Sequence, residues 1–494
     1  MKRAFYGCFS LFLLMILAVV LRYPQNNLIP GRMLLFTVIW IGILYSVKVA
    51  LGFLGKQMKK KGLNVEKLSR TGLFFYVLFY MVCLFLISVM LRSEPVTDYG
   101  SVYRTAERLA LGEKVKDWSY FSMWTNNLGT LSMLTAAMKG SLLIGFLDPY
   151  YGVLVLHVFQ AAAVLLSIFY LTGLVWKERT LQWFAILLFS MWTPVWACTN
   201  AFYSDQFSFG GSVIGTALLF YAGKTSCRWK SRLCIVLAGI LWGLGIVAKV
   251  TAAIPLIALI IAWIFFYRKG WIHLKQGICM VLVIALCAGT MSFISNRYPS
   301  KKDEERLKFS TEYWIALGLL GNGTYGENED FIEGCYLSKD KEARKAYCRQ
   351  VIWDHRESFF DIERIIKKTS VIFGTGEISP TSHIYPEKEN LLWQCVHYEG
   401  TYYWKYCCLS TSFFDAVLVL LFAGCVSRVV KKREENGLVF MSYLAVFGLF
   451  FFLMFWEAQN KQLYNHIPWM TLCAVWGIRT DITKRKEKVQ DGKE

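Results

Sequence analysis

Apolar residues gather in twelve long runs that alternate with polar segments, and this alternation dominates the chain. Each run approaches the roughly 20 residues that an α-helix needs to cross the hydrocarbon core of a bilayer. The runs predict membrane-spanning helices at 4–21, 33–54, 72–91, 151–175, 181–198, 207–223, 233–250, 252–267, 277–294, 413–430, 438–456 and 465–478. The pattern therefore predicts an all-α polytopic membrane protein with about 12 transmembrane helices.

Composition supports this class and excludes others. Of the 494 residues, 55% are hydrophobic and 18% are charged, whereas a soluble domain carries about 25% charged residues. Soluble, disordered and small disulfide-rich proteins are thereby excluded. One further apolar run, 127–147, is expected to lie as a helix in or near the membrane interface rather than to span the bilayer.

The basic residues fix the expected orientation. With twelve spans, one side holds 27 Lys and Arg against 8 Asp and Glu, and the other holds 26 against 27, while Lys48 lies inside a span. Cytoplasmic loops are enriched in Lys and Arg, so both termini are expected in the cytoplasm. The net charge of +19 then reports membrane orientation, and no nucleic-acid partner is needed to explain it.

The loops divide the chain into four parts. Residues 1–71 hold two N-terminal helices, the first an expected uncleaved anchor, and 72–294 hold a transmembrane core with a first outer loop at 92–150. A large extracytoplasmic loop follows at 295–410, with helix expected at 339–366 and loops at 318–326 and 374–380. Residues 411–494 hold the last helices and a basic cytoplasmic tail. The sequence does not determine which of the outer cysteines pair with one another. No disulfide is therefore predicted among Cys335, Cys348, Cys395, Cys407 and Cys408.

Asp98 is the first candidate for chemistry. It precedes a predicted helix at 99–112, in which Val102 and Ala106 share one face and Arg104 and Arg108 share another. A helix N-terminus keeps a carboxylate ionised, which suits a general base. The alternative is an ordinary helix N-cap.

Further polar residues fall at the outer ends of the predicted spans. Tyr120, Asn126 and Asn127 could bind sugar hydroxyls, or they could form an aromatic belt and a helix cap. Asp205 and Lys249 lie at the mouths of spans, where polar groups are functional candidates. Lys249 suits a phosphate group as a compact charge, or it is a lysine that snorkels from a helix end.

The last outer loop is unusually polar for a connecting turn, with Glu457, Lys461, Tyr464 and His466 close together. The six histidines and the outer cysteines show no metal-ligand spacing, and the requirement for a metal or another cofactor stays open. A Walker loop, a dinucleotide glycine motif and a nucleophile elbow are missing from the sequence.

Taken in order, these segments resemble the GT-C class of integral membrane glycosyltransferases. They are most similar to the glycosyltransferase family 39 group, with its protein mannosyltransferases and aminoarabinose transferases. The resemblance covers most of the chain from about residue 72 onward. It rests on Glu94-Pro-Val-Thr-Asp98, the helix that ends at Gly112, Tyr120-Phe, Trp124-Thr-Asn-Asn127, Tyr203-Ser-Asp205, Ala248-Lys249-x-Thr251, Trp314-Ile-Ala-Leu-Gly-Leu319, Gly323-Thr-Tyr325, Asp330 and Glu457. Two positions depart from the group: Thr125 replaces a proline, and Lys461 stands where many relatives have arginine.

The resemblance implies a GT-C-like bundle with juxtamembrane helices in its first outer loop. It implies inverting transfer of a sugar from a polyprenyl-phosphate donor to an acceptor hydroxyl of the cell envelope, on a glycopolymer, lipid or protein. Asp98 would be the base. The donor phosphate would meet Lys249, Lys461 and Arg104, and the substrates would contact Tyr120, Asn126, Asn127, Asp205, Glu457 and His466.

Other functions stay open at this stage. A polytopic transporter or flippase for a lipid-linked saccharide would also be basic on its inner side, although broken helices in paired halves are typical of transporters. An inactive assembly partner with the same fold is a third interpretation. In each case the expected location is a bacterial cell membrane, with the site on the extracytoplasmic side and the bilayer as a constant partner.

Overall fold

The computed structural model describes residues 1–266, 273–295, 297–298, 307–378, 384–431 and 436–478, and within them the chain is almost entirely helical. Pro380, in one predicted loop, and the basic tail after 478 lie outside the described residues. Eight of the described helices are long and apolar enough to cross a membrane: α1 (Lys2–Arg22), α2 (Pro30–Lys60), α3 (Val65–Met90), α7 (Pro149–Val175), α12 (Arg228–Ala248), α14 (Leu274–Ser295), α21 (Tyr403–Val430) and α22 (Gly437–Phe455). The all-α polytopic class predicted from the sequence is confirmed.

The other four predicted spans are helical but interrupted. They contain α8 (Arg179–Ser190), α11 (Gly211–Lys224), α13 (Ile254–Phe266) and α23 (Ile467–Ile478). A helix of 12–14 residues rises about 18–21 Å, less than the roughly 30 Å of a hydrocarbon core. Short broken turns extend these helices: α9 (Thr193–Cys198), α10 (Ser204–Ser208), η2 (Val250–Ala253) and η6 (Asn460–His466). The count of twelve spans therefore stays a prediction.

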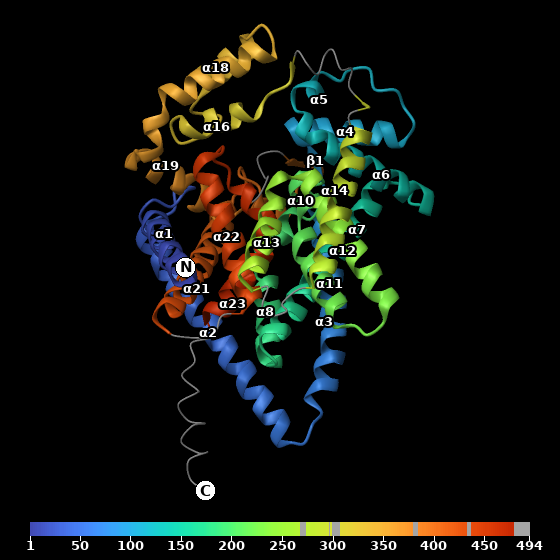
Figure 1. Ribbon diagram of the computed structural model, residues 1–494, viewed down its shortest axis with the longest axis vertical. Helices are drawn as coiled ribbons and strands as arrows, with labels where there is room; N and C mark the ends of the chain where they lie inside the picture. Colours follow the sequence, from blue (N-terminus) through green and yellow to red (C-terminus); the bar gives the residue numbers. More distant parts are fainter. Residues whose placement is uncertain (267–272, 296, 299–306, 379–383, 432–435, 479–494) are drawn as a thin grey trace.

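Both predicted outer loops lie at the same end of the bundle, opposite the turn between α2 and α3 (Figure 1). The first loop holds α4 (Thr97–Ala110), α5 (Ser119–Met123), η1 (Thr125–Asn127) and α6 (Leu128–Ile144). The second holds α16 (Thr311–Leu319), α17 (Glu329–Leu337), α18 (Lys341–Asp354), η4 (Arg356–Phe360), α19 (Ile362–Phe373) and α20 (Leu391–Val396).

A short antiparallel strand pair joins the two outer loops. Strand β1 (Ser93–Pro95) pairs with β2 (Ile384–Pro386), with Glu94 opposite Tyr385. The guanidinium of Arg92, just before β1, forms ion pairs with Asp148 at 2.8 Å and with Glu387 at 2.5 Å. The backbone that leads into α4 is thereby held from both sides.

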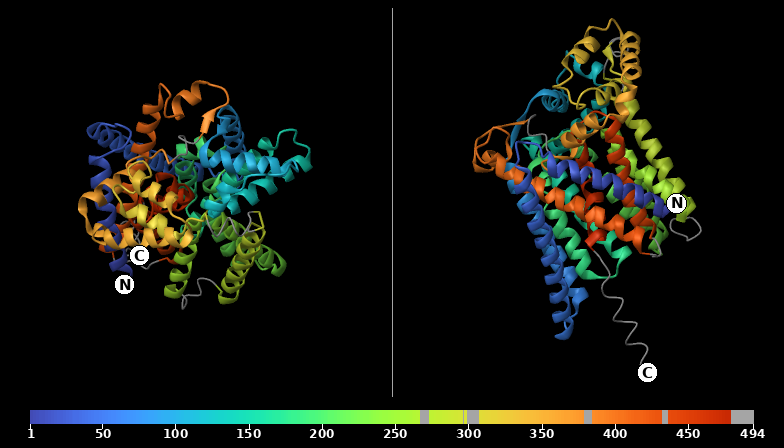
Figure 2. Two further views of the ribbon diagram at one scale, coloured as in Figure 1. Left: turned by 90° about the horizontal axis from the view of Figure 1, so that it is seen from above. Right: turned by 90° about the vertical axis from the view of Figure 1, so that its left-hand side faces the viewer.

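The C-terminal helix α23 lies in the core of the bundle. All twelve residues of α23 are buried, and α21 packs along both α23 and α1. Figure 2 shows α1 beside α21 in its right-hand view. The two N-terminal helices, predicted as an addition before the core, thus contact the last part of the chain.

Helix α6 corresponds to the ambiguous run at 127–147. It is inclined across the outer ends of the bundle (Figure 1) and packs against α4, α7 and α14. Its first half is buried, whereas Leu143 and Ile144 near its end are exposed. Length and composition do not make α6 a candidate span.

Candidate functional site

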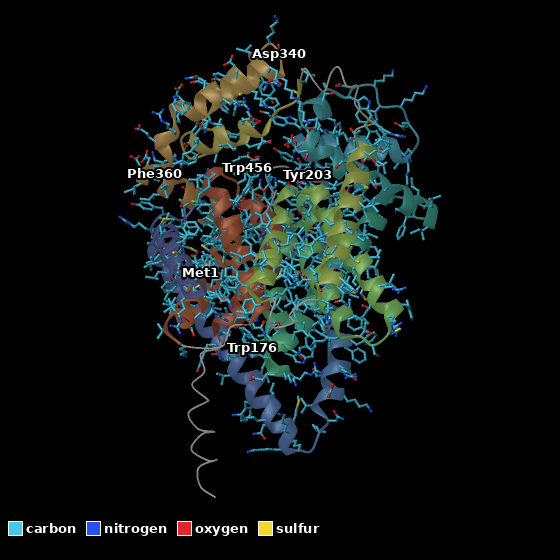
Figure 3. All side chains as sticks on the ribbon, viewed as in Figure 1. Met1, Trp176, Tyr203, Asp340, Phe360 and Trp456 are labelled. Atoms are coloured by element: carbon cyan, nitrogen blue, oxygen red, sulfur yellow. The ribbon has the colours of Figure 1, made fainter. Side chains whose placement is uncertain are left out.

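A cavity of about 810 Å³ lies between the outer end of the bundle and the two outer loops. In Figure 3, Tyr203 and Trp456 lie at this level, above the bundle and below the second loop, and both line the cavity. The structure brings seven of the predicted site residues to its wall: Asp98, Asn126, Asn127, Asp205, Lys249, Glu457 and Lys461. These residues come from five segments that are distant in sequence.

Asp98 enters the cavity from the first turn of α4. The helix begins at Thr97, with Val96 at the N-cap and no side-chain cap. The placement of Asp98 just before the helix is therefore wrong by two residues, and the N-cap alternative is wrong with it. Thr97 takes φ +51°, a strained conformation for a β-branched residue, at the point where the chain turns from β1 into α4.

The remainder of α4 follows the predicted pattern. Val102 and Ala106 are fully buried, and Arg104 and Arg108 are exposed. Asp98 lies in the first turn of α4, where the helix dipole places positive partial charge. The part of the chain that the structure describes shows no ion pair to this carboxylate within 4 Å, so its negative charge is available to the cavity.

Tyrosines and asparagines form a hydrogen-bonded wall beside Asp98. Asn127 Nδ2 donates to the Tyr120 hydroxyl at 2.6 Å, and the Tyr203 hydroxyl donates to Asn127 Oδ1 at 3.1 Å. Asn126 Nδ2 also donates to Asn127 Oδ1, at 3.3 Å. Burial, with the neighbouring Tyr203 and Asp98, raises the pKa of Tyr120. Tyr120 is thus a neutral hydroxyl that accepts a hydrogen bond from Asn127 behind the cavity wall.

Lys249 and Asp205 form a largely buried ion pair, Nζ to Oδ1. Lys249 occupies the C-cap of α12, where its backbone leaves the helix at φ −153°, and Asp205 lies in the first turn of α10. The second carboxylate oxygen of Asp205 accepts from the Tyr99 hydroxyl at 3.5 Å. Each side chain keeps about a tenth of its surface exposed, and that surface faces the cavity.

The loop after α22 brings a second acid and a second cation. Glu457 is buried and accepts a hydrogen bond from Gln459 Nε2. Burial raises the pKa of Glu457 to about 7, and the positive charges of Lys461 and Lys249 oppose this rise. Lys461 places its ammonium 5.7 Å from the centre of the Tyr99 ring, a cation–π distance. The two lysines therefore flank the same carboxylates.

Besides Tyr120, two predicted residues, Arg104 and His466, lie outside the cavity wall. Arg104 is exposed on the far face of α4, with Nη1 3.5 Å from the Pro95 carbonyl oxygen. His466 is fully buried in η6, and its Nδ1 lies 2.7 Å from Asn465 Oδ1. The structure therefore leaves Lys249 and Lys461 as the cations of the cavity, and it places His466 among the groups that support η6.

Aromatic side chains that were not predicted as site residues form the outer part of the cavity wall. Trp314, Tyr325 and Tyr336 belong to the second outer loop, and Trp124 and Trp456 lie in ring contact with Trp314. The rings of Trp314 and Trp456 stack with their centroids 6.3 Å apart. The abundance of aromatic residues in 295–410 was the available signal, but their convergence depends on how this loop docks.

Lys368 fastens the second outer loop to the loop that carries Glu457. This fully buried lysine of α19 donates to the carbonyl oxygens of Gly318, at 2.6 Å, and Trp456, at 2.5 Å. The Ala458 amide donates to the Gly323 carbonyl at 2.9 Å. Burial lowers the pKa of Lys368 to about 7. Sequence reasoning missed Lys368, because its partners are backbone atoms of distant segments.

The described residues include no group of three or more His, Cys, Asp or Glu side chains that could hold a metal ion. The carboxylates of Asp98, Asp205 and Glu457 line one cavity, but they do not converge on a common point. The metal requirement, which the sequence left open, stays open.

Comparison with known proteins identifies a family for the chain. No curated protein and no solved structure matches the chain. A family described as "Conserved hypothetical integral membrane protein" matches residues 1–358, a region that includes Asp98 and Lys249 and ends before Glu457. Because this match covers well over half of the 494 residues, the chain belongs to this family of integral membrane proteins.

Proposed function

We propose that this protein is a membrane glycosyltransferase of the GT-C class. It moves a sugar from a polyprenyl-phosphate donor to an acceptor hydroxyl on the outer face of the membrane. The observation that carries the proposal is the single cavity in which the Asp98 carboxylate and the ammonium groups of Lys249 and Lys461 meet. Inverting transfer from a phosphate carrier needs a base at one end of the site and cations at the other.

Each step of the reaction has a group of suitable chemistry. Asp98 takes the proton of the acceptor hydroxyl, whose oxygen attacks C1 of the sugar from the face opposite the phosphate. The C1–O bond breaks, its electron pair leaves with the polyprenyl phosphate, and the anomeric centre inverts. Lys249 and Lys461 stabilise the phosphate as its negative charge increases.

The polar residues of the cavity wall carry groups that can form hydrogen bonds with a sugar. Asn126 offers amide groups to sugar hydroxyls, and Asn127 is held in place by Tyr120 and Tyr203. Glu457, with a pKa of about 7, supplies either a donor or an acceptor near neutral pH. A volume of about 810 Å³ is within the usual range of roughly 300–1,000 Å³ for small-molecule sites.

The apolar part of the cavity lining supports a donor whose lipid chain lies in the membrane. Ile246 and Val247 of α12 and Ala288 of α14 line the cavity, and all three lie in the outer parts of apolar helices that are candidate spans. An isoprenoid chain would find apolar surface there while its phosphate reaches the lysines. Helix α6, which contributes Leu128 and Gly129, walls the same side.

The alternative is a polytopic transporter for a lipid-linked saccharide. The broken segments α10, η2 and η6 favour it, because discontinuous helices around a polar site are typical of transporters. Against it, the cavity reaches only residues 246–251 around the end of α12 and residues 288–295 of α14. A transport path would have to continue inward past Trp242 and Trp476, which are both buried.

The test compares the wild type, Asp98→Asn and Glu113→Gln, purified in lipid and incubated with polyprenyl-phosphate sugars. Glu113 is an exposed acid just beyond α4, so its variant controls for loss of a nearby negative charge. Sugar release or transfer by the wild type and by Glu113→Gln, reduced about 10²–10⁴-fold in Asp98→Asn, is the expected result. Equal turnover by all three would exclude Asp98 as the base, and carrier flipping without sugar release would favour the transporter.

A further inference from the structure

The second outer loop contains two cysteines that the fold brings together. Cys335 lies near the end of α17 and Cys348 lies in the middle of α18. Their sulfur atoms are 3.8 Å apart, and both side chains are fully buried. The three residues that connect the helices, 338–340, turn the chain so that the two helices pack face to face.

The surroundings of the pair leave little freedom to either thiol. Phe331, Tyr313 and Phe309 belong to the same small hydrophobic cluster as the two cysteines. Arg344, one turn before Cys348, donates from Nε to the Cys335 carbonyl oxygen at 2.7 Å and from Nη1 to the Leu307 carbonyl oxygen at 2.6 Å. The backbones that carry the sulfur atoms are thereby fixed at a separation that a small side-chain rotation would close.

We propose that Cys335 and Cys348 form an intramolecular disulfide that links α17 to α18, in the part of the second outer loop that borders the cavity. A buried pair at this spacing meets the proximity requirement of a disulfide, and disulfides persist on the oxidising side of a membrane. None of the other outer cysteines has a thiol hydrogen-bond partner among the cysteines that the structure describes. The assignment rests on the contacts of α17 and α18 and is independent of the proposed glycosyltransferase activity.

Formation of the bond requires an external disulfide as oxidant, such as an oxidised thiol–disulfide oxidoreductase. The thiolate of Cys348 attacks one sulfur of that disulfide and displaces the other as a thiolate. The thiolate of Cys335 then attacks the Cys348 sulfur and releases the second, so the oxidant leaves as a dithiol with two electrons and two protons. The hydrogen bond from Cys335, with the charge of Arg344, lowers the pKa of Cys348, which suits the first attack.

The proposed bond has a structural consequence for the cavity. Tyr336, adjacent to Cys335, lines the cavity, and the same hydrophobic cluster contacts Trp124 of the first outer loop. Trp124 stacks on Phe309 with ring centroids 4.4 Å apart. A covalent link between α17 and α18 would fix the cluster from which both aromatic side chains are presented.

The direct test maps the thiols of the full-length protein from its own membranes. Membranes are denatured in excess N-ethylmaleimide without reductant, and the digested protein is analysed by mass spectrometry. The expected result is one peptide pair joined through Cys335 and Cys348, released by dithiothreitol. Recovery of both cysteines mainly as maleimide adducts, or a bond from either one to Cys395, Cys407 or Cys408, would overturn the assignment.

A second measurement tests whether the disulfide between α17 and α18 stabilises the protein against thermal unfolding. Dithiothreitol should lower the Tm of the wild type and of Cys395→Ser, a matched outer-loop control in α20. It should leave the Tm of the double variant Cys335→Ser/Cys348→Ser unchanged. A reductant-dependent shift that persists in the double variant would contradict the proposal. If the double variant does not fold, the peptide map of the wild type decides alone.

Discussion

At the scale of single residues, the ion pair between Lys249 and Asp205 raises the question of what each partner is for. Both side chains are largely withdrawn from solvent. A buried pair contributes little net stability, but the removal of one partner leaves an uncompensated charge and costs about 3–5 kcal/mol. Loss of binding after a single substitution would therefore not by itself distinguish a phosphate ligand from a structural cation.

A double-variant cycle separates these roles. Lys249→Met should lower the unfolding free energy by a few kcal/mol, and Lys249→Met/Asp205→Leu should recover most of it because neither charge then remains unpaired. Donor affinity should stay low in both variants if Lys249 contacts the phosphate. Thermal unfolding and binding of a polyprenyl-phosphate sugar measure the two effects. Recovery of donor affinity in the double variant would show that Lys249 serves only the fold.

Glu457 provides a prediction about pH. Its pKa rises from 4.5 to about 7 on folding, so between these values the folded protein holds a proton that the unfolded chain has lost. The unfolding free energy should therefore decrease as pH rises through this window, by up to about 3 kcal/mol in total. Glu457→Gln should remove this decrease, whereas Glu113→Gln, in an exposed position, should retain it. Parallel pH profiles for the wild type and Glu457→Gln would contradict the placement of Glu457 in a buried site.

At the scale of elements, Lys368 links α19 to the end of α16 and to the start of the last outer loop. Lys368→Met would leave the Trp456 carbonyl without its buried donor, while the Gly318 carbonyl would keep only the hydrogen bond from Arg364. An unsatisfied buried polar group costs about 1–3 kcal/mol, so Tm should fall. The loop at 456–459 should also become more mobile, which hydrogen exchange of the Ala458 amide would report.

Lys367→Met is the matched control for this prediction. The neighbouring Lys367 is exposed and pairs with Glu363 one turn earlier, at 2.9 Å. Exposed pairs of this kind contribute about 1 kcal/mol or less, so both Tm and amide exchange should change little. If Lys367→Met and Lys368→Met behaved alike, the buried hydrogen bonds of Lys368 would not hold the loop.

The helices also show which features of the fold the hydrophobic pattern predicts and which it does not. All twelve apolar runs contain helix, because a run of that length has no other way to satisfy its backbone in lipid. The breaks within four of them were not predictable, since distant side chains satisfy the freed backbone groups. Gln160 donates to the Phe209 carbonyl between α10 and α11, and Trp242 Nε1 donates to the Ala252 carbonyl at 3.1 Å.

The candidate site likewise contains some residues that the sequence identified and others that it did not. Asp98, Lys249 and Glu457 were found because each is a polar residue at the outer end of an apolar run, a position that the sequence displays. Trp314 was noted only as part of a family motif and Lys368 was missed, because their roles at the site exist only after the second outer loop has docked on the bundle. Local pattern identifies residues that border the membrane, and tertiary packing decides which of them face the same cavity.

At the scale of the whole molecule, the arrangement predicts which end of the protein faces the outside of the cell. Both large loops and the cavity lie at one end, and the turn between α2 and α3 lies at the other (Figures 1 and 2). In Figure 2, seen from above, the second outer loop covers the C-terminal helices while α4 and α6 lie to one side. The basic cluster at 56–70 belongs to the far end, which the positive-inside rule places in the cytoplasm.

Two matched epitope insertions test this orientation in intact cells. Gly62 and Gly326 both lie in exposed turns where an added side chain would meet no atom within 4 Å. We expect an epitope beside Gly326 to bind antibody, or protease, from outside the cell, and one beside Gly62 to do so only after the membrane is permeabilised. The reverse pattern would place the cavity in the cytoplasm, where thiols stay reduced. It would then exclude both transfer on the outer face and persistence of the Cys335–Cys348 bond.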